Sequence, residues 1–191
     1  MVKTFDPQSN KSSYTKFLNY MHTEKSARVE YLSIRTTESA DKDLIISPLH
    51  LIARVNKEKK VEFVFAKELK LDDQLVIEAP DGQRKHAKCI RIESIMDSGA
   101  YAPLTESGTI MVSNVLASCY ANTYNHDLAH LVFKPVRFWY TYINDYIISG
   151  NSSSSSTEQN REDGINWYAK AFLNIVNTIP EVISSNLVKL N

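Results

Sequence analysis

One short segment carries two side chains that can act together on a backbone carbonyl. Ser47 and His50 lie three residues apart around Pro48, inside a run that is otherwise apolar from Leu44 to Ile52. A hydroxyl and an imidazole at this spacing can both reach one carbonyl at a strand edge, where the imidazole can donate a proton to a leaving amide nitrogen. The same spacing also fits a strand-end histidine whose nitrogens are simply hydrogen-bonded, which is the commoner outcome for an isolated motif.

Cys119 ends a second apolar run, in the segment Ala117-Ser118-Cys119-Tyr120. Free cysteine usually packs as a small hydrophobic residue, whereas a reactive cysteine needs a partly exposed, electropositive setting. Composition favours the structural role and leaves the reactive one open. Cys89 occupies an ordinary strand position, and two cysteines are too few for a disulfide framework.

The other histidines allow weaker interpretations. His22 could accept a proton at neutral pH, since an unperturbed imidazole has a pKa near 6.5, or it could be a surface or strand-end residue. His126 and His130 have the four-residue spacing that can bind a metal, but the sequence suggests no third ligand, so no metal site is predicted. His86 lies in a charged turn and is expected to be solvated.

The positions of these residues depend on a β-rich region up to about residue 120. Apolar and polar residues alternate in short stretches, such as Val61 to Phe65, which predicts short strands. The continuous apolar character from Leu44 to Ile52 suggests a strand buried on both faces. A long apolar stretch from Thr109 to Cys119 is broken at Ser113-Asn114.

The pattern becomes helical after Cys119. Leu128, Leu131, Phe138 and Tyr142 fit helical spacing, and Pro135 should start or kink a helix. Five serines near residues 150–160 indicate a flexible insert. A second helical pattern then runs over residues 167–178.

Two aromatic pairs stand out in this helical region, Trp139-Tyr140 and Trp167-Tyr168. Such side chains can pack on a planar apolar ligand or at a membrane interface. An amphipathic helix that covers a core uses the same residue types.

The composition excludes several classes of function. Lys+Arg and Asp+Glu are both 22, so the net charge is zero, which argues against nucleic-acid binding and against a polybasic membrane patch. No run approaches the roughly 18 apolar residues that span a bilayer, and the first residues do not read as a signal peptide. The sequence contains no Gly-rich phosphate loop and no paired-cysteine zinc site.

Longer blocks of sequence closely resemble the C-terminal autoprocessing domain of hedgehog proteins. They occur in the same order and cover nearly the whole chain. The blocks are residues 17–22 (FLNYMH), 45–51 (IISPLHL), 99–105 (GAYAPLT), 108–110 (GTI), 114–121 (NVLASCYA), 128–130 (LAH) and 164–168 (GINWY).

This resemblance implies a mainly β fold, the horseshoe-like Hint fold that hedgehog proteins share with inteins, followed by a helical C-terminal appendage. Residues 1–120 would form a Hint domain that lacks its first strands and its nucleophile. Residues 121–191 would form a helical sterol-recognition region with the disordered serine-rich insert.

The resemblance also implies a reaction in two steps. A cysteine at the start of the domain attacks the preceding glycine carbonyl, so that a thioester replaces an amide. The hydroxyl of cholesterol then attacks the thioester, and the signalling half leaves as a cholesterol ester. One difficult acyl transfer is thereby divided into two easier ones.

Roles for individual residues follow from the matched motifs. The family's Thr-x-x-His motif falls on Ser47 and His50, and His50 would assist thioester formation. Cys119 matches the second cysteine, which exchanges with or supports the first. His22 falls where most members have the aspartate that activates the sterol hydroxyl. The sterol-facing candidates are Trp139, Tyr140, Trp167 and Tyr168.

The implied partners are the hedgehog signalling domain in cis, cholesterol as co-substrate without a further cofactor, and a membrane through the sterol-recognition tail. The implied location of the full precursor is the secretory pathway and the extracellular space. The family opens with Cys-Phe and about two strands that this chain does not match, so Met1 could be an internal methionine and the chain alone is expected to be inactive.

Two alternatives stay open. The chain could be an inactive remnant that acts as a sterol-binding or structural module. Splicing of the intein kind is disfavoured, because inteins close on a His-Asn pair and this chain closes on Val-Lys-Leu-Asn.

Overall fold

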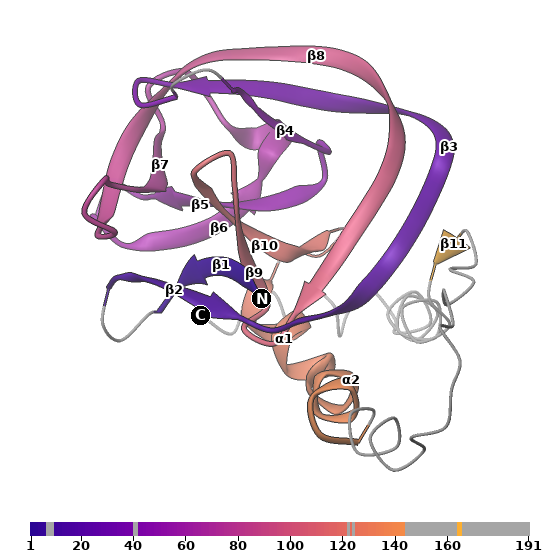
Figure 1. The fold of residues 1–191 in the computed structure, drawn as a ribbon. Helices are drawn as coiled ribbons and strands as arrows, with labels where there is room; N and C mark the ends of the chain where they lie inside the picture. The colour runs from indigo at the N-terminus through magenta and orange to yellow at the C-terminus, as the bar shows by residue number, and fades with distance from the viewer. Residues whose placement is uncertain (7–9, 40–41, 122, 124, 144–163, 166–191) are drawn as a thin grey trace, which may run out of the picture.

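The computed structural model describes residues 1–6, 10–39, 42–121, 123, 125–143 and 164–165. Strands dominate this part of the chain (Figure 1). The strands are β1 (Val2–Phe5), β2 (Ser12–Thr15), β3 (Phe17–Thr36), β4 (Leu44–Ile46), β5 (His50–Val55), β6 (Val61–Phe65), β7 (Gln74–Glu78), β8 (Arg84–Thr105), β9 (Thr109–Val112), β10 (Val115–Ala121) and β11 (Gly164–Ile165). The helical segments are η1 (Ala66–Glu68), α1 (His126–Val132), α2 (Lys134–Phe138) and the π-helical η2 (Trp139–Ile143).

The described strands form two sheets. β1 and β2 make a small hairpin, and the others join one large sheet in the order β11-β3-β8-β7-β10-β5-β6, with β4 beside β3 and β9 beside β10. All pairings in the large sheet are antiparallel. β10 thereby runs through the centre of the sheet, between β7 and β5.

β3 and β8 are much longer than the sequence pattern predicts. They contain 20 and 22 residues and pair along most of their length, curving together around one side of the molecule (Figure 1). The expectation of short strands is therefore wrong here. Residues 24–26 in the middle of β3 are exposed, and a strand alternates clearly only where one of its faces is buried. Register shifts, one of them between Glu24 and Arg28, accommodate the curvature.

The apolar run around Ser47 is two strands rather than one strand buried on both faces. β4 pairs with β3, whereas β5 pairs with β6, β7 and β10. The turn at residues 47–49 separates them and carries the chain from one part of the sheet to the other. Both strands contribute apolar side chains to the main core. The core cluster consists of Ile34, Leu44, Ile46, Ile52, Ala66, Leu69, Leu75, Ile77, Ala87, Cys89, Val115 and Ala117.

The predicted break at Ser113-Asn114 is a tight hairpin turn between β9 and β10. Both residues have positive φ, 45° and 66°, as a two-residue turn of type I′ requires. The hairpin returns the chain into β10, whose residues 115–120 are all buried. This buried strand carries the segment that ends in Cys119.

The helical region that follows β10 consists of short segments rather than one continuous helix. Asn125 caps α1, its side chain accepting a hydrogen bond from the Leu128 amide at 2.9 Å. Pro135 lies in the first turn of α2, so the prediction that it starts or kinks a helix is confirmed. The serine-rich insert and the helical pattern at 167–178 lie outside the described residues. Among the helices that the structure describes, none is both long and apolar enough to cross a bilayer.

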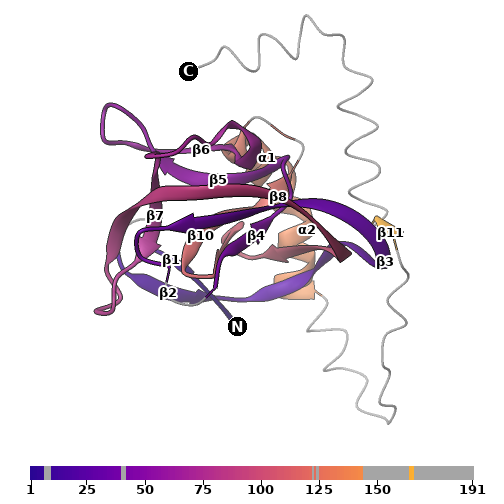
Figure 2. The same ribbon diagram turned by 90° about the horizontal axis from the view of Figure 1, so that it is seen from above.

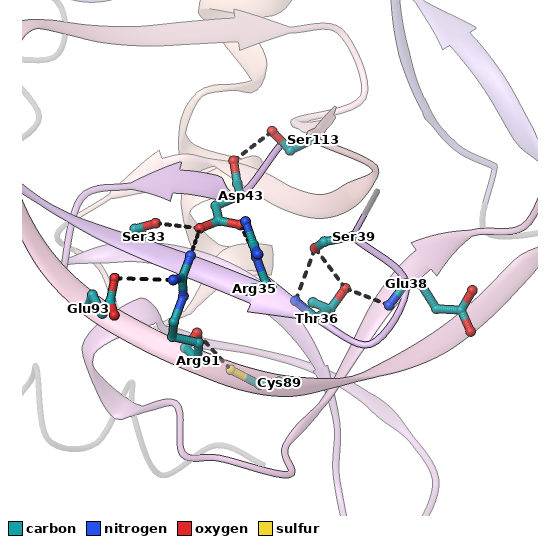
Figure 3. A network of polar contacts seen from close by, with 10 residues as sticks. All are labelled: Ser33, Arg35, Thr36, Glu38, Ser39, Asp43, Cys89, Arg91, Glu93 and Ser113. Carbon is teal, nitrogen blue, oxygen red and sulfur yellow. Dashed lines mark hydrogen bonds and ion pairs between the residues drawn. The ribbon is translucent and has the colours of Figure 1, made fainter. Parts of the chain in front are cut away.

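A polar cluster around Asp43, the residue just before β4, joins this segment to the long strands β3 and β8 (Figure 3). The Asp43 carboxylate accepts hydrogen bonds from Arg35 at 2.6 Å, from Arg91 at 2.5 Å and from Ser33 at 3.0 Å. These donors come from β3 and β8. Hydrogen bonding to Arg35 is the main cause that lowers the pKa of Asp43 to about 2, so the carboxylate stays ionised down to strongly acidic pH.

The Asp43 cluster should contribute pH-dependent stability. Because the pKa of Asp43 is lower in the folded protein than in the unfolded chain, its contribution is present above pH 3.8 and disappears as the pH falls through about 2. The substitution Asp43→Asn should therefore lower the midpoint of thermal unfolding at pH 7, and the deficit should shrink with acidification over that window. Glu58→Gln, which removes a carboxylate that is 71% exposed, is the control. An equal effect of both variants at every pH would contradict this role of the cluster.

Candidate functional site

His50 and Cys119 lie on neighbouring strands at an irregular part of the sheet. Ala117 pairs with Ile52 and Ala121 pairs with His50, with a register shift between them, so that four residues of β10 span the length of two residues of β5. Strand irregularities of this kind redirect groups near functional sites. Here the His50 imidazole contacts the backbone on this side, because its Nε2 lies 2.8 Å from the carbonyl oxygen of Ser118.

This contact fixes which nitrogen of His50 carries the proton. A carbonyl oxygen can only accept a hydrogen bond, so Nε2 must be protonated, and Nδ1 of the neutral ring is the nitrogen without a proton. Burial lowers the pKa of His50, while the hydrogen bond to Ser118 opposes that effect. His50 is therefore a neutral imidazole at pH 7 with a defined tautomer, as a general base or a hydrogen-bonding catalyst requires.

Cys119 is fully buried beside Thr105 at the end of β8. Its Sγ lies 3.3 Å from Thr105 Oγ1, which itself donates to the carbonyl oxygen of Thr109 at 3.0 Å. The single Thr105 proton is thus used, and the Cys119 thiol is the donor in their contact. Burial raises the pKa of Cys119 to about 11, so that this cysteine is a neutral thiol at pH 7.

Ser47 is linked to His50 through the backbone. The His50 amide donates to the Ser47 carbonyl at 3.0 Å, which closes the turn before β5. His50 is thus joined to Ser47 through the backbone and to the carbonyl of Ser118, the residue before Cys119, whereas the Cys119 thiol contacts Thr105. We call this region, with β5 and β10 as its two sides, the His50 neighbourhood.

A second polar group joins β10 to the helices. Arg137 Nη1 donates to the Tyr120 hydroxyl at 2.9 Å and also to the His130 carbonyl, and the Tyr120 oxygen lies 3.1 Å from His130 Nδ1. Burial and the Arg137 charge lower the pKa of His130 to about 4, so this histidine is neutral at pH 7 beside the Arg137 cation.

Gly108 permits this close approach of α1. Its φ is +73°, and an added Cβ would overlap His130 Nδ1 and come within 3.1 Å of the Tyr120 hydroxyl. The Gly108 carbonyl also accepts from the Cys119 amide at 2.8 Å. Gly108 therefore accepts a hydrogen bond from the Cys119 backbone and, because it has no Cβ, leaves room for His130 of α1.

His22 lies apart from this neighbourhood on the β3–β8 ladder. It pairs with Ala102 of β8 and with Ile165 of β11. Ala102 precedes Thr105 by three residues, which corresponds to about 10 Å along a strand. The His22 Nε2 is 3.7 Å from Glu24 Oε2, and its buried Nδ1 has no hydrogen-bond partner among the residues that the structure describes.

Of the four aromatic residues proposed to face the sterol, the structure describes Trp139 and Tyr140. Trp139 is 49% exposed, whereas the Tyr140 hydroxyl accepts a hydrogen bond from Asn19 Nδ2 at 2.7 Å and fixes η2 to β3. Trp167 and Tyr168 lie outside the described residues. Within the part of the chain that the structure describes, no three His, Cys, Asp or Glu side chains gather as a metal site.

Comparison with known proteins identifies the fold and the family. Residues 1–181 match the family described as the Hint module. The chain belongs to the Hint family. It is similar to sonic hedgehog protein of Xenopus laevis, at 33% identity over 162 residues, 81% of this chain and 35% of the relative. It is also similar to sonic hedgehog protein of Danio rerio, at 28% identity over 161 residues, 82% of this chain and 38% of the relative.

Solved structures of inteins share the fold of this chain. A KlbA intein precursor from Methanococcus jannaschii superposes with a TM-score of 0.52 at 18% identity, covering 65% of this chain and 66% of the intein. An intein from a hyperthermophile gives 0.52 at 12% identity, covering 61% and 70%. The expected mainly β Hint fold with a helical segment near the C-terminus is thereby confirmed. The Hint chain spans little more than a third of the hedgehog relatives it matches.

Several residues of this neighbourhood carry no role in the sequence interpretation. Thr105 lies in a block that resembles hedgehog proteins, but its contact with Cys119 depends on the pairing of distant strands. The spacing of His126 and His130 predicts no metal site and indicates no other contact for them, whereas in the structure they are hydrogen-bond partners of Ser118 and Tyr120. Their four-residue spacing, placed after a buried segment with two hydroxyl groups, is the signal that could have indicated this.

The space around Gly108 should be essential for the helical contact with β10. Gly108→Ala introduces strain at positive φ together with an overlap with His130. We expect it to lower the free energy of unfolding by about 2 kcal/mol more than Gly82→Ala does. Gly82 has a similar φ of +78°, but an added Cβ would come no closer than 3.2 Å to the Ser12 side chain and 3.9 Å to that of Glu78. Chemical denaturation of the two variants measures the difference, and equal destabilisation would show that the approach of α1 is not tight.

Proposed function

We propose that this chain is the catalytic framework of a hedgehog-type autoprocessing unit, which cleaves its precursor by an N-to-S acyl shift and transfers the upstream part to a sterol. The observation that carries the proposal is the His50 imidazole, neutral and held at 2.8 Å from the Ser118 carbonyl, beside the buried Cys119. The match to hedgehog relatives over more than four fifths of the chain supports it.

The first step of the proposed reaction exchanges one acyl bond for another. The thiol of a cysteine upstream of Met1 attacks the carbonyl carbon of the preceding glycine. The new carbon–sulfur bond forms, the carbon–nitrogen bond breaks, and the thiol proton ends on the freed amine. His50 accepts the thiol proton on Nδ1, which carries none, and passes it to the leaving nitrogen, while Ser47 holds the turn that presents His50.

Cys119 acts in this proposal as a neutral supporting thiol. With its pKa raised to about 11, it does not compete with the upstream nucleophile at pH 7. Its hydrogen bond to Thr105 joins β10 to the end of β8. The thiol thus helps to maintain the neighbourhood in which the thioester forms.

The second step transfers the acyl group to a sterol, with cholesterol as the co-substrate. The sterol oxygen forms a bond to the thioester carbon, the carbon–sulfur bond breaks, and the sterol proton passes to a base while sulfur is reprotonated. We propose His22 as this base, because its buried Nδ1 has no hydrogen-bond partner within the described part of the chain and a neutral imidazole can accept a proton. The exposed Trp139 on η2 is a candidate contact for the sterol rings.

The remaining proposals follow from the hedgehog relatives. The upstream partner would be the signalling domain of the same precursor. The region after residue 121 would face the sterol and the membrane, and the precursor would be processed in the secretory pathway before secretion.

The role of His50 can be tested in an extended precursor. A reporter domain, followed by Gly-Cys-Phe and the first strands of the Xenopus laevis relative, is joined to Met1, and cleavage by a small thiol is measured on gels. His50→Ala should lower the cleavage rate by about 100-fold or more, because general acid–base catalysis commonly contributes that much. His86→Ala, which changes an exposed histidine, should cleave normally. Cleavage of the His50 variant at the unaltered rate would refute the assignment.

The role of His22 is tested separately in the same precursor with cholesterol. His22→Asn removes the base, so that sterol-dependent cleavage should fall by about 100-fold while thiol-dependent cleavage persists. His22→Asp restores an anionic base of nearly the same shape as Asn, and sterol-dependent cleavage should equal or exceed that of the unaltered chain. If the Asn variant transfers to sterol as fast as the unaltered chain, His22 is not the base.

A further inference from the structure

His126 and His50 contact the same residue of β10 from two sides. The Ser118 carbonyl lies 2.8 Å from His50 Nε2, and the Ser118 hydroxyl lies 2.9 Å from His126 Nδ1. The Tyr120 amide also donates to the Ser118 hydroxyl at 2.9 Å. Ser118 has no exposed surface, so water does not replace either contact.

The location of Ser118 in the sheet makes the contact between its hydroxyl and His126 important. Ser118 pairs with Thr109 of β9, but on its other side the register between β10 and β5 shifts, so the ladder to β5 is interrupted at this residue. A buried polar group without a partner costs free energy. The His126 contact supplies part of the restraint that β5 does not, and it acts on the residue whose carbonyl sets the His50 tautomer.

His126 is itself held firmly. Its ring stacks on Phe63 of β6, with centroids 4.1 Å apart and planes at 17°, and lies parallel to His130 at 5.9 Å. It is the first residue of α1 after the Asn125 cap. In Figure 2, α1 is drawn beside β6, in agreement with the contact between the rings of His126 and Phe63.

The charged and titratable groups around His126 keep it neutral. Burial is the main cause that lowers its pKa, and Arg137 of α2 lowers it further, whereas Asp127 of α1 opposes them. His130 and Tyr120 also face the ring. His126 can therefore serve as a neutral hydrogen-bond partner over the physiological range of pH.

We propose that His126 is a positioning residue for the acyl shift, which orients the Ser118 peptide so that His50 keeps its proton on Nε2 and its Nδ1 free. The proposal rests on the proposed function for its catalytic consequence, but its structural content concerns this chain alone. It makes α1 a part of the catalytic framework, with no contact of its own to the reacting atoms.

The first test uses the chain itself and measures the His50 tautomer at pH 7.5 by the nitrogen chemical shifts of its ring. The unaltered chain should show Nε2 protonated and Nδ1 unprotonated. His126→Ala and Ser118→Ala should each shift His50 toward a mixture of tautomers. His126→Asn, whose amide can reach the place of Nδ1, should restore most of the Nε2-protonated form. Leu131→Ala, on the exposed side of α1, is the matched control.

The second test measures thiol-dependent cleavage in the extended precursor. His126→Ala and Ser118→Ala should each slow it by about 10-fold or more, and the double variant should be no slower than either, since both remove one contact. His126→Asn should recover most of the rate and the pH profile.

The outcomes separate the two proposals. An unchanged His50 tautomer in folded His126→Ala, or a double variant whose effect is the product of the single ones, would overturn the role of His126. A shifted tautomer in a precursor that never cleaves, even unaltered, would overturn the proposed function and leave the positioning role intact. If His126→Ala does not fold, Ser118→Ala and His126→Asn carry the same comparison.

Discussion

The structure depends on the requirement that the buried polar groups of β10 find partners inside the protein. Residues 115–120 are buried, yet Ser118, Cys119 and Tyr120 bring a hydroxyl, a thiol and a phenol into this interior. β9 pairs regularly with residues 115–118, but the register with β5 shifts between Ala117 and Ala121, so the ladder on that side is interrupted. Side chains therefore take its place.

The partners come from distant parts of the chain. His50 approaches the Ser118 carbonyl from β5, Thr105 meets the Cys119 thiol from β8, and Arg137 reaches the Tyr120 hydroxyl from α2. Each contact satisfies a buried group that would otherwise cost free energy. The same contacts define protonation states, because each assigns a proton to one atom. The same hydrogen bonds therefore stabilise the fold and set the protonation states of the candidate site.

The histidine, cysteine and tyrosine side chains around β10 are kept neutral by their surroundings. Burial lowers the pKa values of His50, His126 and His130 and raises those of Cys119 and Tyr120. Arg137 is the buried cation among these groups, held by the Tyr120 hydroxyl and the His130 carbonyl. Its charge further discourages protonation of the two helix histidines. Neutral imidazoles suit proton transfer, whereas a cationic His50 could not act as a base.

The sequence by itself determined the family, the mainly β class, the turn at Ser113-Asn114 and the helix start at Pro135. These features depend on local preferences or on blocks of residues that resemble hedgehog proteins. It did not determine the lengths of β3 and β8, because strands exposed on both faces lose their alternation. The apolar run from Leu44 to Ile52 also predicted one strand where the structure has β4 and β5, because apolar residues alone do not show where a chain changes its strand-pairing partners.

Only the tertiary structure decided which side chains meet. His50 and Ser118 are 68 residues apart, and the contact between them requires strand pairing and a register shift that no local pattern encodes. The roles of Thr105, His126 and Arg137 depend on the same long-range pairing. A sequence specifies the types of groups that a site can use, but distances, burial and proton positions arise from packing, which brings distant segments together and removes water from between them.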